Sequence, residues 1–194
     1  ILAPLSSFAF KVDAGENLNL TAPIQGDYYV VGGNVNLNTT TNGDVCSAGG
    51  KIFINGDVKE DLLLAGGEMF INGNIGESAR IIGGTIIFDG TIEKDLLIAG
   101  GNIIINGNST IQGETKIAGG KVDFAGTANN IDLNAGEINL KGTIKGNATI
   151  RAEKISFEPT AKILGDLYYE SSKQDTGFEQ IVQGKVTFKQ VNYH

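Results

Sequence analysis

The 194-residue sequence is poor in the residues on which most enzymes and cofactor-binding proteins depend. It contains one Cys, one His, three Pro and no Trp. A single Cys cannot form an internal disulfide. The one His is the last residue, His194, and this excludes multi-histidine metal sites and a buried Ser-His-Asp triad within this sequence. The composition therefore weighs against most familiar classes of enzyme, and we expect no enzyme activity.

Positive charge and long hydrophobic runs are also scarce. There are 15 Lys and Arg residues against 22 Asp and Glu residues, which gives a net charge of −7. Such an acidic chain lacks the electrostatic footprint of a nucleic-acid-binding protein, so we expect no nucleic-acid partner. No segment approaches the roughly 18 consecutive apolar residues of a membrane span. We expect contact with a membrane only through segments outside this chain.

The first nine residues resemble the end of an export signal. Residues 1–5 are mostly apolar, and Ser7-Phe8-Ala9 has the small-x-small spacing of a signal-peptidase site. The sequence therefore predicts a signal-peptide remnant over residues 1–9 and an exported protein of the cell envelope, or one anchored outside the cytoplasm. The alternative is an ordinary N-terminal strand or loop in a cytoplasmic protein.

Glycine, by contrast, is abundant, with 28 of 194 residues, and it recurs at a fixed period. The first Gly of each Gly-Gly pair is a register mark, and these marks are Gly32, Gly49, Gly66, Gly83, Gly100 and Gly119. They are 17 residues apart, except for a final step of 19. Insertions confined to one corner of a repeat are typical of a solenoid.

Within each repeat the apolar residues alternate with polar ones, which is the period of a β-strand. For example, the third position after the mark holds Val35, Ile52, Met69, Ile86 and Ile103. Asn-Gly pairs such as Asn55-Gly56 and Asn72-Gly73 punctuate the repeat, and we expect a positive φ at these corners.

This pattern predicts an all-β fold, a three-sided parallel β-helix of about nine to ten 17-residue turns. We expect the β-helix to span residues 10–171, with a loop and a capping strand over residues 172–194. The crossover rule for parallel strands favours a right-handed helix.

The same turns resemble those of bactofilins, which are bacterial polymer-forming cytoskeletal proteins. Residues 43–58 read Gly-Asp-x-x-x-Ala-Gly-Gly-x-x-x-x-x-Gly followed by Asp-Val. The resemblance covers about residues 15–171, and it includes exported, membrane-associated relatives with a signal peptide before the β-helix. It implies a self-associating scaffold without cofactor, nucleotide or catalytic residues. The expected partner is a second copy of the chain, with a cell-envelope component as a further possibility.

The ends of the solenoid are the first surfaces that could carry such contacts. At the N-terminal end the expected contact residues are Leu18, Leu20 and Ile24, and at the C-terminal end they are Val186 and Phe188. A parallel β-helix exposes unpaired backbone groups at both ends, so it must either cap them or use them to polymerise. End-to-end association and simple capping both remain open from the sequence.

A stripe of apolar residues is the second such surface. It holds Phe53, Phe70, Ile87 and Ile104, each four residues after the mark, where side chains are expected to point outward. Leu63 and Leu97 are expected to point outward on the neighbouring side. Apolar patches of this kind mark partner surfaces. Lateral self-association, cover by the C-terminal segment, and stacking that merely supports the sheet are the three interpretations.

A column of acidic residues marks one corner of the repeat. Asp27, Asp44, Asp61 and Asp95 share this column, and Ser78 interrupts it. Stacked carboxylates can bind Ca²⁺, but the sequence lacks the Gly-Gly-x-Gly-x-Asp repeat of calcium-binding β-rolls. We expect a solvated corner.

The sequence therefore favours a structural scaffold or self-associating rod. The alternative is a cell-surface or periplasmic binding module that uses one side of the solenoid for a polysaccharide or a protein. An enzyme is the least favoured reading, because insertions of two residues cannot build the walls of a substrate groove.

Overall fold

The computed structural model describes residues 10–174 and 177–192 and shows a β-solenoid. Long strands of 10–15 residues recur once per turn from β1 to β11, and shorter strands lie between some of them or follow the last one. The long strands are β1 (Lys11–Leu20), β2 (Tyr28–Leu37), β3 (Val45–Ile54), β4 (Leu62–Ile71), β5 (Ala79–Phe88), β7 (Leu96–Ile105), β8 (Thr110–Phe124), β9 (Thr127–Leu140) and β11 (Ala148–Phe157). The short ones are β6 (Thr91–Ile92), β10 (Thr143–Ile144), β12 (Lys162–Ile163), β13 (Leu167–Ser171) and β14 (Val186–Gln190).

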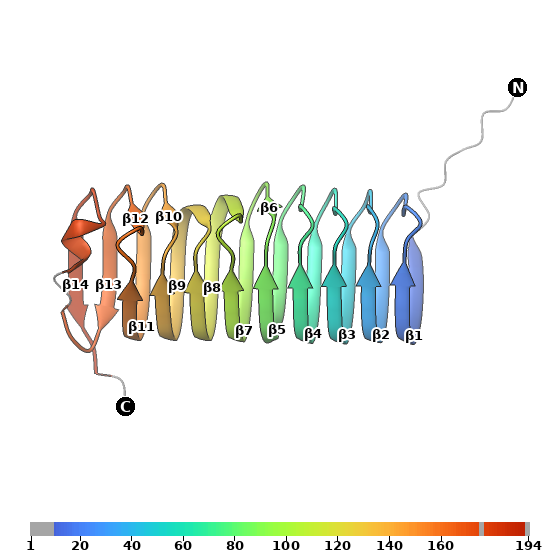
Figure 1. Cartoon of the computed structure of the whole chain (residues 1–194), viewed down its shortest axis with the longest axis horizontal. Helices are drawn as coiled ribbons and strands as arrows, with labels where there is room; N and C mark the ends of the chain where they lie inside the picture. The colour runs from blue at the N-terminus through green and yellow to red at the C-terminus, as the bar shows by residue number, and fades with distance from the viewer. Residues whose placement is uncertain (1–9, 175–176, 193–194) are drawn as a thin grey trace, which may run out of the picture.

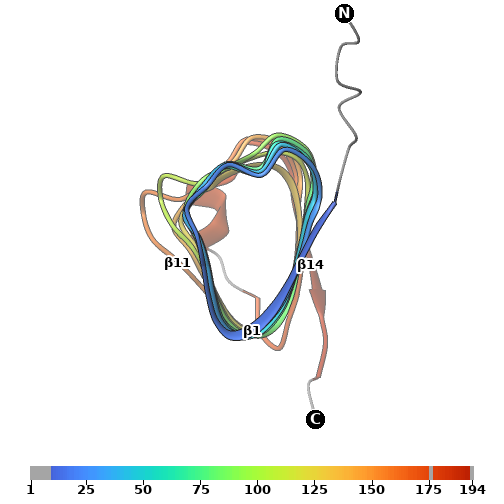
Figure 2. The ribbon, with the colours of Figure 1, turned by 90° about the vertical axis from the view of Figure 1, so that its right-hand side faces the viewer.

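All neighbouring strands pair in parallel, so that each turn lies on the one before it (Figure 1). Seen from the N-terminal end in Figure 2, the chain runs clockwise as it recedes, which makes the coil right-handed. The predicted fold class is confirmed: a right-handed, three-sided parallel β-helix of about ten turns. No helix in the described part of the chain is long and apolar enough to cross a membrane.

Each long strand bends at the register mark, which is a Gly-Gly pair in β2–β5, β7 and β8, and supplies two of the three sides. The third side is formed by single bridges, such as Val58 with Ile75, by the short strands β6, β10 and β12, and by the first residues of β8 and β9. Alternation then places every second side chain inside, where equivalent residues of successive turns lie on one another. Ile52, Met69 and Ile86, for instance, occupy one column and are fully buried. Burial of these columns is the main source of stability.

The Asn-Gly corners require glycine for a different reason from the one that the sequence suggested. The prediction of a positive φ is wrong, because no glycine in the described residues has one. Instead, a Cβ on Gly56 or Gly73 would lie well inside van der Waals contact of the carbonyl oxygen of the turn before, that of Thr39 or Gly56. The corner therefore requires glycine because two backbones approach each other closely.

The sequence predicted a capping strand at the C-terminal end, and the structure adds to it a short helix that the sequence did not indicate. After β13 the chain forms a short 3₁₀ helix, η1 (Gly177–Gln180), and then β14, which pairs with β13. Phe178 of η1 is fully buried, with its ring 4.9 Å from that of Phe157 and 4.7 Å from that of Tyr169. An aromatic side chain from outside the repeat thus closes one end of the core.

Candidate interaction surfaces

The predicted apolar stripe is continuous but half-buried. Phe53, Phe70, Ile87 and Ile104 are in register on β3, β4, β5 and β7. The rings of Phe53 and Phe70 stack with their centroids 4.9 Å apart and their planes 9° apart. Each side chain therefore covers the next one along the column. This packing matches the interpretation in which the stripe supports its own sheet.

A more exposed apolar surface lies on the neighbouring side of the solenoid. It is formed by the outward side chains in the first halves of β1–β5, β7 and β8, and we call it the apolar face. Leu63 and Leu97 belong to it, as the sequence suggested, together with Tyr29, Val31 and Ile82, which sequence reasoning missed. These five side chains are 42–61% exposed. Five large apolar side chains on one side of a small protein form the kind of surface that contacts a partner.

Two columns of side chains make up the apolar face. The first column contains Val12, Tyr29, Cys46, Leu63, Arg80, Leu97 and Lys116. The second contains Ala14, Val31, Ala48, Ala65, Ile82, Ala99 and Ala118. Between Leu63, Ile82 and Leu97 the surface has a shallow hollow of about 280 Å³. The face is therefore flat, with Val31 and Ile82 standing out between alanines.

The same two columns become charged toward the C-terminus. Arg151 donates to Asp132 at 2.8 Å, and Lys189 donates to Glu170 at 3.2 Å. Tyr168 also donates its hydroxyl hydrogen to Glu170, at 2.6 Å. These two donors hold the pKa of the Glu170 carboxyl below its usual value. The apolar face thus ends at a surface of paired charges.

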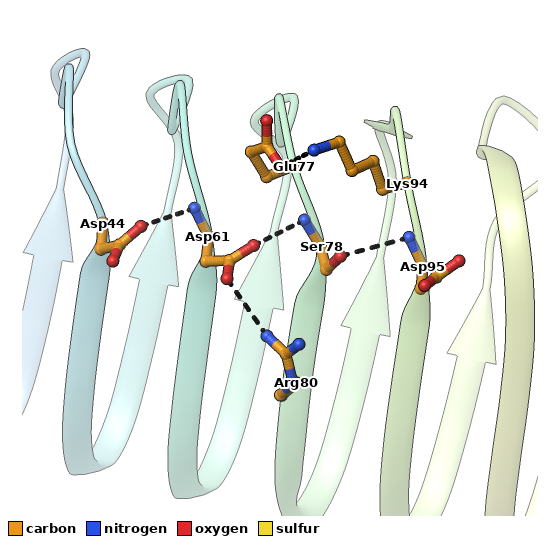
Figure 3. Close-up of polar contacts among 7 residues, drawn as sticks. All are labelled: Asp44, Asp61, Glu77, Ser78, Arg80, Lys94 and Asp95. Carbon is orange, nitrogen blue, oxygen red and sulfur yellow. Dashed lines mark hydrogen bonds and ion pairs between the residues drawn. The ribbon is translucent and has the colours of Figure 1, made fainter.

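The acidic corner is a ladder of hydrogen bonds to the backbone (Figure 3). The Ser78 N–H donates to Asp61 Oδ1 at 2.9 Å, and the Asp61 N–H donates to Asp44 Oδ1 at 2.9 Å. Asn130 and Asn147 accept in the same way in later turns. Each acidic side chain therefore satisfies a backbone donor of the next turn. These carboxylates therefore have a structural role within the fold.

Asp61 provides a test of this ladder. Its Oδ1 accepts the Ser78 N–H, and its Oδ2 accepts from Arg80 at 3.3 Å (Figure 3). We expect Asp61→Ala to lower the free energy of unfolding by about 1–3 kcal/mol, because a partly buried N–H loses its acceptor. Asp61→Asn keeps an acceptor and should cost less than about half of that. Thermal unfolding followed by circular dichroism measures both, and equal losses would contradict the ladder.

The N-terminal turn has a charged half and an apolar half. Lys11 and Asp13 occupy two columns that hold Tyr28 and Val30 in the next turn, and they form an ion pair at 3.0 Å. Tyr28 donates its hydroxyl hydrogen to Asp13 at 3.0 Å. The bond to Lys11 holds the pKa of the Asp13 carboxyl below its usual value, whereas burial raises the pKa of the Tyr28 hydroxyl. This end is therefore partly sealed by polar contacts.

The remaining predicted end residues lie where the repeat places them. Leu20 and Ile24 are buried and Leu18 is half-buried, all three on the core side of the first turn. Val186 and Phe188 are half-buried in β14, and the Phe188 ring lies 5.0 Å from that of Tyr169. Residues 1–9, the predicted signal remnant, lie outside the described residues.

Comparisons with known proteins returned no relative: no family's sequence model, no curated protein and no solved structure matches this chain.

Proposed function

We propose that this protein is a non-catalytic structural rod that associates end to end, in the manner of the bactofilins that its repeat resembles. Export to the cell envelope belongs to the same proposal and depends on residues 1–9. The acidic side chains of the corner column accept hydrogen bonds from backbone N–H groups of the next turn. This structural use of the carboxylates supports a scaffold rather than an enzyme.

The observation that carries the proposal is the pair of open sheet edges. Within the described part of the chain, β1 pairs only with β2, and β14 pairs only with β13. The Lys11 N–H donates to the Asp27 carbonyl oxygen in the next turn. Because alternate residues of a strand direct their backbone groups to opposite sides, Val12 and Ala14 direct theirs away from β2. Such an edge is a template for pairing with another chain.

Proline at position 14 tests this edge. Ala14 is exposed, and its N–H points away from β2, so Ala14→Pro removes a donor from the free edge without breaking the β1–β2 ladder. Ala14→Ser is the matched control, because it keeps the N–H. We expect the full chain to form an open-ended series of oligomers in sedimentation velocity, and filaments in negative-stain images. Ala14→Pro should abolish the filaments, and Ala14→Ser should retain them.

Two outcomes would overturn the proposal. If the full-length chain stays monomeric at millimolar concentration, it does not polymerise. That result would favour the alternative function, a binding module for a polysaccharide or a protein. Filaments that form equally well with Ala14→Pro would show that the β1 edge is not the contact.

A further inference from the structure

We propose that the Asn106-Gly107 pair is a site of spontaneous covalent modification, at which the folded chain loses ammonia from Asn106 and takes up water. The chain itself is the substrate, and water is the only co-reactant. The proposal is independent of self-association, because it depends on one corner of the repeat and on no second copy of the chain.

An asparagine side chain can react with the backbone nitrogen of the residue that follows it. Here the nitrogen of Gly107 attacks Cγ of Asn106, so that an N–Cγ bond forms and the Cγ–Nδ2 bond breaks. Nδ2 leaves as ammonia and takes with it the hydrogen of the Gly107 N–H. Water then opens the five-membered cyclic imide at either of its two carbonyl groups, which gives aspartate or isoaspartate at position 106. Glycine favours the attack because no Cβ shields its nitrogen.

Three of the four Asn-Gly pairs in the sequence are held by the turn before them. The four pairs are Asn42-Gly43, Asn55-Gly56, Asn72-Gly73 and Asn106-Gly107. The imide ring closes only when the peptide unit between the two residues rotates, so close packing against this unit blocks the reaction. A Cβ on Gly43, Gly56 or Gly73 would collide with backbone atoms of the turn before. These three peptide units therefore cannot rotate unless the whole corner separates from its neighbour.

Hydrogen bonds add to this restraint at Asn55-Gly56. The Gly56 N–H, which would be the attacking group, donates to the Leu37 carbonyl oxygen at 3.1 Å. The Asn55 side chain donates to Asn38 at 2.7 Å and accepts from Asn72 at 2.8 Å. Both reacting groups are thus occupied, and the reaction requires a local opening of the corner.

The corner at Asn106-Gly107 contains two extra residues and lacks these restraints. A Cβ on Gly107 would meet nothing closer than the Ala125 carbonyl oxygen at 3.9 Å. Within the described part of the chain, the Gly107 N–H has no acceptor, and the Asn106 side chain makes one hydrogen bond, from Nδ2 to Asp89 Oδ2 at 3.3 Å. The Ser109 N–H closes the turn on the Asn106 carbonyl oxygen at 3.0 Å. The attacking nitrogen is therefore free, and the peptide unit has room to rotate.

The product changes the charge of this corner. The Asp89 carboxylate loses the donor at Asn106 Nδ2 and gains a neighbour of its own sign. The net charge of the chain changes from −7 to about −8. Because ammonia is lost, the conversion does not reverse, and the converted fraction increases with the age of the folded chain.

Peptide mass spectrometry of the full chain follows the four pairs separately during incubation at mildly alkaline pH. Trypsin cleaves after Lys and Arg and places the pairs in four peptides, residues 12–51, 52–59, 60–80 and 95–116. The same chain unfolded in guanidinium chloride gives the rate of each pair without the fold. We expect folding to slow conversion at Asn42, Asn55 and Asn72 at least about tenfold, and at Asn106 less than about threefold.

Gly107→Ala tests the attack itself. There is room for the added Cβ, so the variant should fold, and the Cβ beside the attacking nitrogen should slow conversion at Asn106 roughly tenfold. Asn108→Ala is the matched control in the same turn, because it leaves the reacting pair intact, and its rate should not change. Protection of Asn106 equal to that of Asn55, or conversion at Asn42 as fast as at Asn106, would overturn the proposal. An unchanged rate in Gly107→Ala would also overturn it.

Discussion

Gly73→Ala should lower the free energy of unfolding by about 2–4 kcal/mol, although it adds only a methyl group. The Cβ would collide with the carbonyl oxygen of Gly56 in the turn before. The oxygen belongs to the backbone and the Cβ is fixed to the Cα of residue 73, so neither can move without disturbing the ladders on either side. For a chain of this size, such a loss lowers the melting temperature by roughly 5–10 °C.

Gly107 is the matched control for this prediction. It also follows an Asn at the same corner, but there the turn contains two extra residues. A Cβ on Gly107 would meet nothing closer than the Ala125 carbonyl oxygen at 3.9 Å. We expect Gly107→Ala to leave the melting temperature unchanged or to raise it by a few degrees, because alanine restricts the unfolded chain. Equal losses for the two variants in thermal circular dichroism would contradict the close-approach explanation.

Phe178→Ala should cost about 3–5 kcal/mol, the range for removing a fully buried aromatic side chain. The Phe178 ring contacts the rings of Phe157 and Tyr169 and closes the C-terminal end of the core. Because each turn of a solenoid contacts only its neighbours, the damage should stay local. β13 and β14 should exchange their amide hydrogens much faster, while β2–β5 should be unchanged.

Hydrogen-exchange mass spectrometry measures this local effect. Phe10→Ala is the control, since Phe10 is 68% exposed and its removal should change the free energy of unfolding by less than about 0.5 kcal/mol. Faster exchange spread evenly over the whole chain would show that the solenoid unfolds as one unit. Protected β13 and β14 would show that Phe178 is not the cap.

The sequence predicted the solenoid well because one physical constraint repeats in every turn. Residues such as Ile52, Met69 and Ile86 are apolar since each lies on the previous one inside the core. The glycine corner was located correctly but explained wrongly. An Asn-Gly dipeptide suggests a positive φ from sequence alone, and no glycine in the described residues has one. The close approach of two backbones can be seen only in the three-dimensional structure.

The features that sequence reasoning missed are those that do not repeat. Phe178 lies in a segment where the 17-residue register is lost, so no column could align it. Val31 and Ile82 lie three turns apart, with alanines between them, and no run of large apolar residues marks their column. The stripe from Phe53 to Ile104 occupies consecutive turns, so it was the more visible pattern although its side chains are less exposed.

The regular stacking of turns also has a consequence for how the chain folds. Equivalent residues in contact, such as Asn17 and Asn34, are 17 positions apart in a chain of 194. The relative contact order is therefore about 0.09, which lies within the range of helical bundles and well below that of β-sandwiches. Loop closure costs the same small entropy for each new turn. The chain can therefore fold in order during its synthesis, each turn using the finished one before it as a template.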